Sequence, residues 1–281
     1  MKKIMLGDFQ NLLIRGMSKL PYFSHNGIFT SGLYGLLTQM ARYALVHEPD
    51  IIFMCNDYPP YKRKEIFPDY KRKANVERTK LDEEFFASLS ISRTICMEVL
   101  KRLGIPVLMR QGFEADDIMA KVAQVYSPKV EKIIIVSNDS DLYQLLKYRN
   151  VYMDKGKTGM YSYTQFKKEY VIEPKDWVNV LSIAGSHNAV PPIKKGIGQK
   201  TALKMLSRES KYEELFTSHA KEIELRKNLA RLPYEDFELV VEENKKRYTY
   251  SNFSVWLRRK YGIEVNLSLD KMFKMLLKEG R

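Results

Sequence analysis

Gly112-Phe113-Glu114-Ala115-Asp116-Asp117 begins the stretch that decides the fold. After a helical run, the same stretch continues as Val130-Glu131-Lys132-Ile133-Ile134-Ile135-Val136-Ser137-Asn138-Asp139-Ser140-Asp141. The run from Ile133 to Val136 is too apolar for an exposed strand and predicts the buried middle of a parallel sheet. Asp139 and Asp141 follow it directly, at the carboxyl end of a strand, where open α/β sheets place their sites. An α/β fold with an acidic site is therefore expected.

Three carboxylates, Glu114, Asp116 and Asp117, stand at the start of the helix before this strand. Carboxylates in a first turn interact with the positive end of the helix dipole, so ordinary capping is one interpretation. Three of them in four residues exceed what capping needs. If they converge with Asp139 and Asp141, they repel one another unless cations lie between them. Oxygen ligands of this kind select Mg²⁺ or Mn²⁺. We favour a divalent-metal site over a solvated acidic surface.

Two further apolar strands are predicted, and each also ends in an aspartate. Residues 4–6 lead to Asp8, and residues 51–54 lead to Asn56 and Asp57. Together with the strand before Asp139, this pattern indicates one sheet edge with carboxylates directed at a shared point.

The composition agrees with a polyanionic substrate. The chain has 281 residues, 44% of them hydrophobic, and a net charge of +13 with a pI near 9.4. This length allows one large core, or one core and a smaller helical domain. A basic protein with a tight acidic cluster suits a polyanion handled through metal ions. Cys55 and Cys96 are expected to be small apolar residues in a reducing compartment. No stretch predicts a membrane span, and the first residues are typical of a strand rather than of a signal peptide.

Helical and strand patterns fill the remaining chain. Helices are expected over 33–46 and 81–103, with Gly104 as the stop of the second. A short strand is expected at 107–109, an edge strand at 150–153 and a loop at 155–159. Residues 9–32 contain Asn11, Leu12 and Arg15 followed by a turn-rich stretch. From Thr164 onward the pattern is helical, which predicts an α/β domain over 1–163 and a helical region over 164–281.

A basic stretch follows Asp57. Residues 61–80 hold eight basic and three acidic side chains, with tyrosines and Phe67 between them. Basic side chains bind phosphates and aromatic rings stack on unpaired bases, although a solvated helix face gives the same pattern. Because the stretch comes directly after Asp57, we favour a nucleic-acid clamp. The expected DNA-binding residues here are Lys62, Lys64, Tyr70, Arg72 and Lys73.

A second phosphate-binding pattern lies in the helical region, at residues 191–206. Gly196-Ile197-Gly198 precedes a helix with Lys200 and Thr201 in its first turn, and Lys194 and Lys195 come just before. Glycines bring backbone N–H groups close to a phosphate, and the helix start adds partial positive charge. The pattern predicts a helix-hairpin-helix type contact to a DNA backbone, which carries no sequence information.

Taken together, these motifs resemble the 5′-nucleases, the flap endonucleases and 5′–3′ exonucleases, and most of all their bacteriophage branch. The matching motifs run in family order over about residues 4–206. They are Asp8 with Asn11, Leu12 and Arg15; Asp57; Tyr70-Lys71; Leu81-Asp82-Glu83-Glu84-Phe85-Phe86; Glu114-Ala115-Asp116-Asp117; Ser137-Asn138-Asp139-Ser140-Asp141; and Gly196-Ile197-Gly198-Gln199-Lys200-Thr201-Ala202.

The resemblance implies a mostly parallel sheet flanked by helices, a helical arch at about residues 58–100 and a helix-three-turn-helix motif. It implies Mg²⁺-dependent (or Mn²⁺-dependent) hydrolysis of phosphodiesters at DNA 5′ ends, flaps or RNA primers, with K⁺ as a further ion at the 196–198 loop. Lys71, Arg15 and Arg63 match or lie near the family's basic residues that face the scissile phosphate. The implied metal ligands are Asp8, Asp57, Glu114, Asp116, Asp117, Asp139 and Asp141.

The resemblance also implies a cellular setting. The expected protein is a monomer in the cytoplasm, the host's if a phage encodes it. A single-strand binding protein or a polymerase would be its replication partners.

One departure from the family pattern affects the second metal site. The family carries two more aspartates in a Gly-Asp-x-x-Asp-Asn pattern, and counting back from Gly196 places Ser186 and Ala189 at those positions. His187 and Asn188 are candidates for weak substitute ligands, and for His187 we favour a role other than that of a ligand. Weak second-metal binding, a one-metal mechanism, a borrowed ligand and loss of activity all stay open. The competing functions are an active 5′ nuclease and a DNA-junction binding protein whose catalysis has decayed. A ribonuclease of the related small-nuclease fold would leave residues 185–281 unexplained.

Overall fold

The computed structural model describes residues 2–18, 20, 24–71, 80–156, 159–186, 190–207, 213–241 and 248–277, and for 80–83 and 214–216 it describes the backbone alone. The chain divides into two compact units built from interleaved segments. The first unit takes Met1–Asn56, Val76–Leu108 and Val240–Arg281, and the second takes Asp57–Asn75 and Met109–Leu239. The sequence suggested a division at residue 163, whereas the structure keeps residues on both sides of that point in the second unit.

The main sheet has six strands in the order β5-β4-β1-β6-β7-β8. In the first unit, β1 pairs with β4 and β4 with β5, both in parallel. In the second unit, β6 pairs with β7 in parallel and β7 with β8 antiparallel. The predicted mostly parallel sheet is confirmed. The strands are β1 (Lys3–Asp8), β4 (Ile51–Cys55), β5 (Val107–Leu108), β6 (Lys132–Val136), β7 (Val151–Asp154) and β8 (Met160–Tyr161).

The prediction that the strand near residues 150–153 is an edge strand is wrong. The expected loop at 155–159 is the connection of a hairpin, whose second arm, β8, pairs with β7 and takes the edge. The two residues of β8 are too few to give a periodic signal in the sequence, so the pattern could not reveal it.

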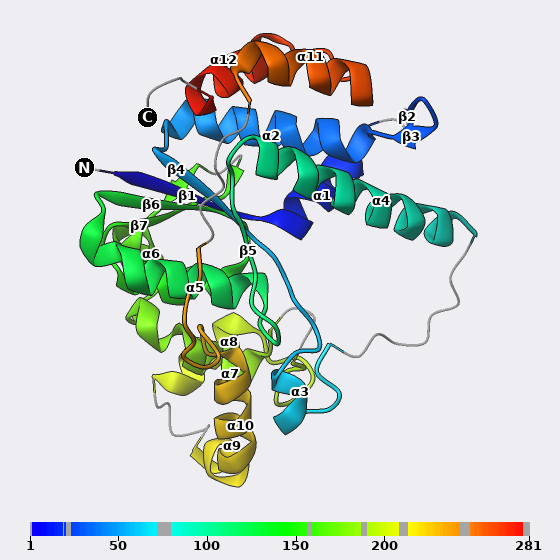
Figure 1. Ribbon diagram of the computed structural model, residues 1–281. Helices are drawn as coiled ribbons and strands as arrows, with labels where there is room; N and C mark the ends of the chain where they lie inside the picture. Colours follow the sequence, from blue (N-terminus) through cyan, green and yellow to red (C-terminus); the bar gives the residue numbers. More distant parts are fainter. Residues whose placement is uncertain are drawn as a thin grey trace. The chain divides into compact units, whose positions relative to one another are not determined.

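In the first unit, helices pack beside β1, β4 and β5. They are α1 (Phe9–Met17), α2 (Ser31–His47), α4 (Lys80–Arg102), α11 (Tyr250–Tyr261) and α12 (Leu267–Leu276), and a small hairpin joins β2 (Ser24–His25) to β3 (Ile28–Phe29). Figure 1 shows α12 lying along α2. The helices expected over 33–46 and 81–103 are found as α2 and α4, and Gly104 has a φ of +72° just after α4.

Helix α1 was missed by the sequence analysis, which left residues 9–32 as a turn-rich stretch. Asp8 ends β1 and caps this helix, because its Oδ1 accepts a hydrogen bond of 2.9 Å from the backbone N–H of Asn11. The helix buries Phe9, Leu12 and Leu13. Within the described residues, no helix is both long and apolar enough to cross a membrane.

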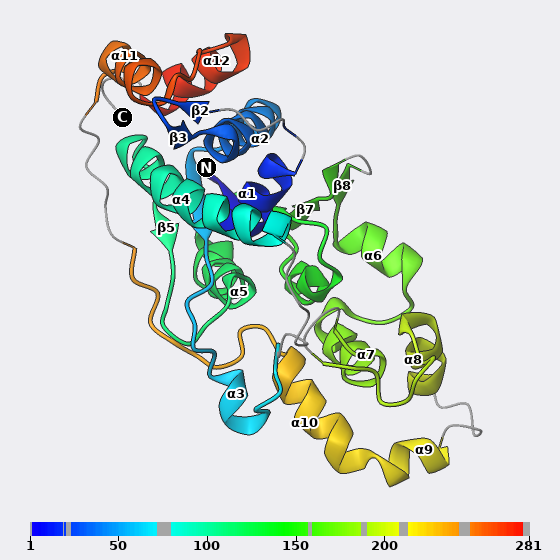
Figure 2. The same cartoon turned by 90° about the vertical axis from the view of Figure 1, so that its right-hand side faces the viewer.

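The second unit surrounds β6, β7 and β8 with short helices. They are α3 (Arg63–Ile66), α5 (Ala115–Tyr126), α6 (Tyr163–Glu169), α7 (Trp177–Ala184), α8 (Gln199–Leu206), α9 (Glu213–Ser218) and α10 (Ala220–Ala230), with 3-10 turns η1 (Ser127–Lys129), η2 (Ser140–Lys147) and η4 (Pro174–Asp176). Helix α7 packs against both α8 and α10, and Figure 2 shows the end of α10 beside α3. The buried rings of Tyr143, Phe166 and Trp177 join η2, α6 and α7. This core places the residues after β6 next to the helical region.

Candidate metal centre and nucleic-acid surface

The residues after β4 meet the start of α5 in the second unit. Asp57 Oδ1 accepts a 2.8 Å hydrogen bond from the backbone N–H of Ala115, the first residue of α5. Its other oxygen, Oδ2, accepts from the Tyr61 hydroxyl at 2.7 Å and lies 3.8 Å from Lys71 Nζ. Asp57 is therefore held by a helix start, where a negative charge is stabilised.

Lys71 is the cation among these carboxylates. Its Nζ forms an ion pair with Glu114 Oε1, and its backbone takes a φ of +50°, a left-handed conformation that is uncommon for a residue other than glycine. Burial works to lower the pKa of Lys71, but Glu114 and then Asp57 outweigh it and raise the pKa. The ammonium group therefore stays charged. It neutralises part of the acidic site, which is where the sequence placed a metal ion.

Arg63 is buried, with 2% of its surface exposed, and each N–H of its guanidinium has an oxygen atom as its partner. Two N–H groups bind the Asp117 carboxylate at 2.5 and 2.8 Å, and one approaches Glu114 Oε2 at 3.1 Å. The other two donate to the carbonyls of Leu229 (2.8 Å) and Arg231 (3.1 Å), at the end of α10. Burial lowers the pKa of Arg63, but the adjacent Asp117 carboxylate raises it more strongly. One guanidinium thus joins α3, α5 and α10.

Asp117 has no oxygen lone pair left for a metal ion. It is fully buried, and each of its oxygens accepts one bond from Arg63. Oδ2 also accepts from the N–H of Glu114 at 3.1 Å, and Oδ1 from the N–H of Tyr234 at 2.8 Å. Four bonds saturate a carboxylate. The structure therefore places Asp117 and Arg63 together in a buried network, which Arg63 extends to Glu114.

Tyr70 takes part in the same network. It is 4% exposed, its hydroxyl donates to Glu114 Oε2 at 2.7 Å, and its ring lies 5.7 Å from the Arg63 guanidinium. Burial raises the pKa of this hydroxyl, so it stays a donor. A buried ring offers no face to a base, which corrects the expectation that Tyr70 stacks on nucleic acid. Glu114, 6% exposed, is held by Tyr70, Arg63 and Lys71.

Asp139 and Asp141 follow β6 and differ from the residues at the start of α5. Asp139 is exposed, and its Oδ1 accepts a 2.9 Å bond from the N–H of Asp141. The pKa of Asp141 is raised to about 7, first by burial and then by the negative charges of Asp139 and Glu114, against which Arg63 and Lys71 act only in part. Within the described residues, Arg63 and Lys71 offset this negative charge only in part, and a divalent cation would relieve the remaining repulsion.

No set of three histidine, cysteine, aspartate or glutamate side chains is grouped closely enough to hold a metal ion by itself within the part of the chain that the structure describes. Asp8 belongs to the first unit, while the other six predicted ligands belong to the second. Asp116 lies in the first turn of α5, and its charge helps to raise the pKa of Lys71. The meeting of all seven carboxylates around an ion therefore stays a prediction.

The glycine loop that was predicted to bind phosphate precedes α8, and its binding role stays a prediction. Gly196 has a φ of +90°, Gly198 caps α8, and a Cβ added at either position would meet nothing within 4 Å. Lys194, Lys195 and Lys200 are exposed around it, and Thr201 is half-buried. Gln199 Nε2 donates to Ser140 Oγ at 3.2 Å, which fixes the start of α8 to the residue between Asp139 and Asp141. The open loop and the two carboxylates are thus neighbours.

The loop where the family carries two more aspartates is closed by its own backbone. The N–H of Ser186 donates to the carbonyl of Val190 at 3.0 Å. Gly185, at a φ of +80°, leaves no room for a Cβ, which would lie 2.5 Å from that carbonyl. Ser186 supplies a hydroxyl and no carboxylate. His187, Asn188 and Ala189 lie outside the described residues, as do Arg72 and Lys73.

Two further basic side chains of the 61–80 stretch, Lys62 and Lys64, lie among the described residues. Lys62 pairs with Glu235 at 2.7 Å, whereas Lys64 is exposed. Arg15 lies in the first unit, at the end of α1. The sequence analysis did not identify Tyr61 as a partner of Asp57 or Gln199 as a partner of Ser140. Tyr61 lies only four residues after Asp57, a weak signal. Gln199 and Ser140 are 59 residues apart, and their contact exists only in the fold.

The six-stranded, mostly parallel sheet with helices beside it defines an α/β protein with acidic residues after three of its strands. Residues 3–173 match the family model described as the 5′–3′ exonuclease, N-terminal resolvase-like domain. The match covers more than half of the chain, and the chain belongs to this family. It is 28% identical to a 5′–3′ exonuclease of Aquifex aeolicus over 241 residues, which are 85% of this chain and 80% of that protein. It also matches a DNA polymerase I of Caldicellulosiruptor bescii at 25% identity, but spans only 25% of that protein.

Two solved structures share the fold. A 5′-exonuclease of T5 with bound divalent metal ions (zinc) superposes with a TM-score of 0.70 at 16% identity, covering 99% of both chains. A flap endonuclease of bacteriophage T5, in a complex with DNA and metal ions, gives a TM-score of 0.68 at 17% identity, covering 99% of this chain and 98% of that one. At these identities the likeness establishes the fold.

Proposed function

We propose that this protein is a metal-dependent 5′ nuclease that hydrolyses DNA phosphodiesters at 5′ ends, flaps or RNA primers during replication. The observation that carries the proposal is the segment after β6. Asp139 and Asp141 bear negative charge that the described residues offset only in part, and the pKa of Asp141 rises to about 7. Next to them, the open loop before α8 presents backbone N–H groups and three lysines to a phosphate backbone.

The donor set fits Mg²⁺ or Mn²⁺ by its chemistry. All the candidate ligands are carboxylates, the hard oxygen donors that these ions prefer. We assign this role to Asp8, Asp57, Glu114, Asp116, Asp139 and Asp141. We assign Asp117 to the Arg63 network instead, because its four acceptor positions are occupied. Bound ions would supply hydroxide near neutral pH and would stabilise the charge that develops on the phosphate.

The residues of the chain itself act on the substrate by position and charge. Lys71 Nζ, between Asp57 and Glu114, is the group that we assign to the scissile phosphate, where it stabilises developing negative charge. Asp57, fixed by the N–H of Ala115, and Glu114, fixed by Tyr70 and Arg63, keep their carboxylates in place while the ammonium turns toward a phosphate oxygen. Lys194, Lys195, Lys200, Thr201 and the glycines of the loop would hold the duplex, with K⁺ as a further ion there.

A second candidate function is a DNA-junction binding protein with weakened catalysis. The observation in its favour is Ser186, which has no carboxylate to offer a second ion and whose loop is closed by the bond to Val190. The relatives named DNA polymerase I and 5′–3′ exonuclease favour activity and a role in replication. We therefore keep the nuclease as the first proposal and regard replication proteins as its partners.

One experiment separates the two functions. Purified protein is incubated with end-labelled 5′-flap DNA, with Mg²⁺, with Mn²⁺ or with EDTA, beside an Asp139→Asn variant. A nuclease cleaves the flap only with metal, and the variant does not. Tight flap binding without cleavage under every condition would support the binding protein instead.

A further inference from the structure

A pocket between α1 and α2 in the first unit has not been assigned a function. It encloses about 200 Å³. It exists because the two helices touch backbone to backbone: a Cβ added at Gly35 would lie 2.6 Å from the Cα of Gly16. Beside this close contact, larger side chains form the walls of the pocket. They include Arg15, Leu20, Tyr34, Gln39, Arg42 and Tyr43.

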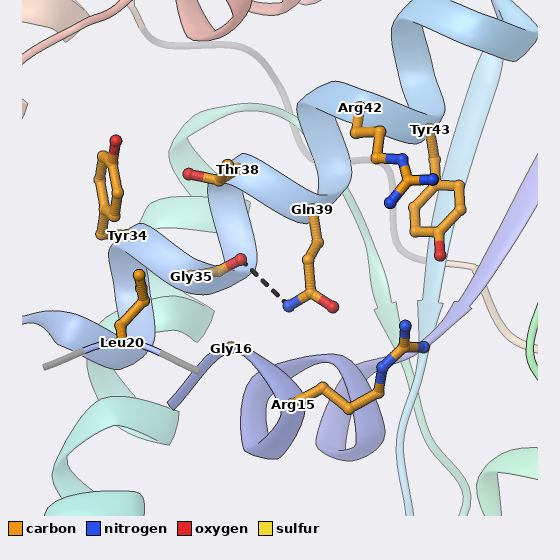
Figure 3. A pocket seen from close by; sticks show the side chains of 9 residues that line it. All are labelled: Arg15, Gly16, Leu20, Tyr34, Gly35, Thr38, Gln39, Arg42 and Tyr43. Atoms are coloured by element: carbon orange, nitrogen blue, oxygen red, sulfur yellow. Dashed lines mark hydrogen bonds between the residues drawn. The ribbon is translucent and has the colours of Figure 1, made fainter. Parts of the chain in front are cut away.

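One end of the pocket is cationic. Figure 3 shows the side chains of Arg15, from α1, and Arg42, from α2, pointing toward one another. The ring of Tyr43 lies beside them, 5.8 Å from the guanidinium of Arg42. None of the residues that line the pocket is acidic. Two like charges that converge repel each other, and an anion between them removes the repulsion. Guanidinium groups pair best with phosphate or carboxylate, through paired N–H bonds.

The middle of the pocket holds a fixed hydrogen-bond acceptor. Gln39 Nε2 donates to the carbonyl of Leu12 at 2.8 Å and to that of Gly35 at 3.1 Å. Both hydrogens of the amide are thereby used, so the Gln39 carbonyl oxygen keeps one orientation and can accept from a ligand. The exposed hydroxyl of Thr38 lies in the same wall. These groups suit a ligand with its own donors next to its anionic part.

Leu20 and Tyr34 line the other end of the pocket, and the Tyr34 hydroxyl accepts a 3.4 Å hydrogen bond from Asn266 Nδ2. Tyr34 and Arg42 are eight residues apart on α2, about 12 Å along the helix axis. An aromatic wall at one end and two guanidinium groups at the other fit a molecule with a flat ring and a phosphate. We propose that this pocket binds one nucleotide, with its phosphate between Arg15 and Arg42 and its base against Tyr34.

The position of the pocket on α1 indicates the source of the nucleotide. Asp8 caps α1 and Arg15 follows seven residues later, about 10 Å along the helix. If Asp8 is a metal ligand, the pocket holds a nucleotide of the substrate strand close to the cleaved bond. This part of the inference rests on the proposed nuclease function, whereas the nucleotide pocket itself does not.

The test uses the full chain in EDTA, so that no metal ion can bring a phosphate to the carboxylates. Binding of deoxyadenosine monophosphate is followed by saturation-transfer NMR and calorimetry, beside deoxyadenosine and inorganic phosphate. The monophosphate is expected to bind more tightly than either fragment. Arg42→Ala, at an exposed position, should weaken it by about tenfold or more, the loss of one charged hydrogen bond. Arg259→Ala, which removes an exposed arginine from α11 of the same unit, should leave the affinity unchanged.

If the monophosphate does not bind, or binds Arg42→Ala and the intact protein equally, the proposed nucleotide pocket is wrong. This conclusion holds whether or not the protein cleaves DNA. Competition then identifies the source. If a strand occupies the pocket, an oligonucleotide with a single-stranded 5′ extension abolishes the saturation-transfer signal of the monophosphate. A signal that survives saturating oligonucleotide overturns the substrate-strand assignment and identifies a free nucleotide as the ligand.

Discussion

The second unit contains two acidic segments that differ in how their charge is balanced. At the start of α5, Asp117 has four hydrogen-bond donors, and Glu114 is held by Arg63, Tyr70 and Lys71. After β6, burial and then the charges of Asp139 and Glu114 raise the pKa of Asp141 to about 7. Among the described residues, Arg63 and Lys71 form ion pairs with Glu114 and Asp117 in the first segment, whereas they offset the charge of Asp141 only in part.

This difference shows that a cluster of carboxylates in a sequence divides into two functional kinds. A buried carboxylate with every lone pair used fixes the structure, because removing its partner leaves an unpaired buried charge. A carboxylate whose pKa is raised by other carboxylates is ready for an external cation. We therefore expect substitutions in the two segments to act on different measured quantities.

Removal of Arg63 should have the largest effect, and on stability. Arg63→Met leaves the fully buried Asp117 charge without its partner, so the free energy of unfolding should fall by about 3–5 kcal/mol. Urea unfolding of the metal-free protein measures this. Arg149→Met, which removes an exposed arginine that lies over the Tyr163 ring, is the matched control in the same unit. A loss for Arg63→Met no greater than for the control would show that the network does not stabilise the fold.

Lys71→Ala should act on activity instead. Loss of a cation that stabilises the transition state costs about 10²- to 10³-fold in kcat, with little change in KM. Since the ammonium also competes with metal ions for Asp57 and Glu114, the variant should bind Mn²⁺ at least as tightly as the intact protein. Single-turnover cleavage of flap DNA and Mn²⁺ titration give the two values. An unchanged kcat would show that Lys71 does not stabilise the transition state. Weaker Mn²⁺ binding would show that Lys71 holds the metal ligands in place and does not compete with the ion for them.

The pKa of Asp141 predicts a smaller, pH-dependent effect. An aspartate of the unfolded chain titrates near 3.9, while in the folded protein burial, Asp139 and Glu114 raise the pKa of Asp141 to about 7. Between these values the folded state binds the extra proton, so its stability falls as the pH rises through the window. Asp141→Asn removes this loss. The Tm difference between metal-free variant and intact protein should grow from about pH 4 to pH 7.

An exposed side chain that does not titrate gives the control for this pH effect. Asn138→Ala, in the same segment, should shift Tm by a constant amount over the same range. If the Tm difference between Asp141→Asn and the intact protein were also independent of pH, the raised pKa of Asp141 would be contradicted.

Ser186→Asp should give the smallest effect. It restores a carboxylate at the position where the family carries one, and an added charged oxygen ligand should tighten Mn²⁺ binding by up to about tenfold. Ser186→Asn, of nearly the same size and neutral, is the control. If both variants bind Mn²⁺ alike, position 186 does not face an ion.

The sequence predicted the strands and the ends of the strands well, because residues 4–6, 51–54 and 133–136 are continuous apolar runs followed by aspartate. It did not predict α1, whose start depends on the Asp8 cap, or β8, which is two residues long. Local sequence patterns are enough to predict the long strands. A helix cap and a short edge strand depend on contacts that form only in the folded chain.

The sequence analysis assigned a role to each candidate site residue, but it could not tell which of these side chains the fold buries. The sequence could not show that Asp116 and Asp117 differ in burial. Asp117 is fully buried, whereas Asp116, in the same turn of the helix, is half-buried. The sequence analysis placed Arg63 near the scissile phosphate, whereas in the fold it is buried and donates to the carbonyls of Leu229 and Arg231, more than 160 residues away. Only the packing of α3 on α10 shows that it is buried.

The central claim is that Asp139 and Asp141 are the carboxylates that receive a divalent ion. Mn²⁺ titration followed by electron paramagnetic resonance tests it directly, because free Mn²⁺ gives a signal that binding removes. We predict that the intact protein and the Asp69→Asn control bind Mn²⁺ alike, and that Asp139→Asn binds it at least tenfold more weakly, a loss of about 1.4 kcal/mol or more. Equal Mn²⁺ binding by Asp139→Asn and the intact protein would contradict the account.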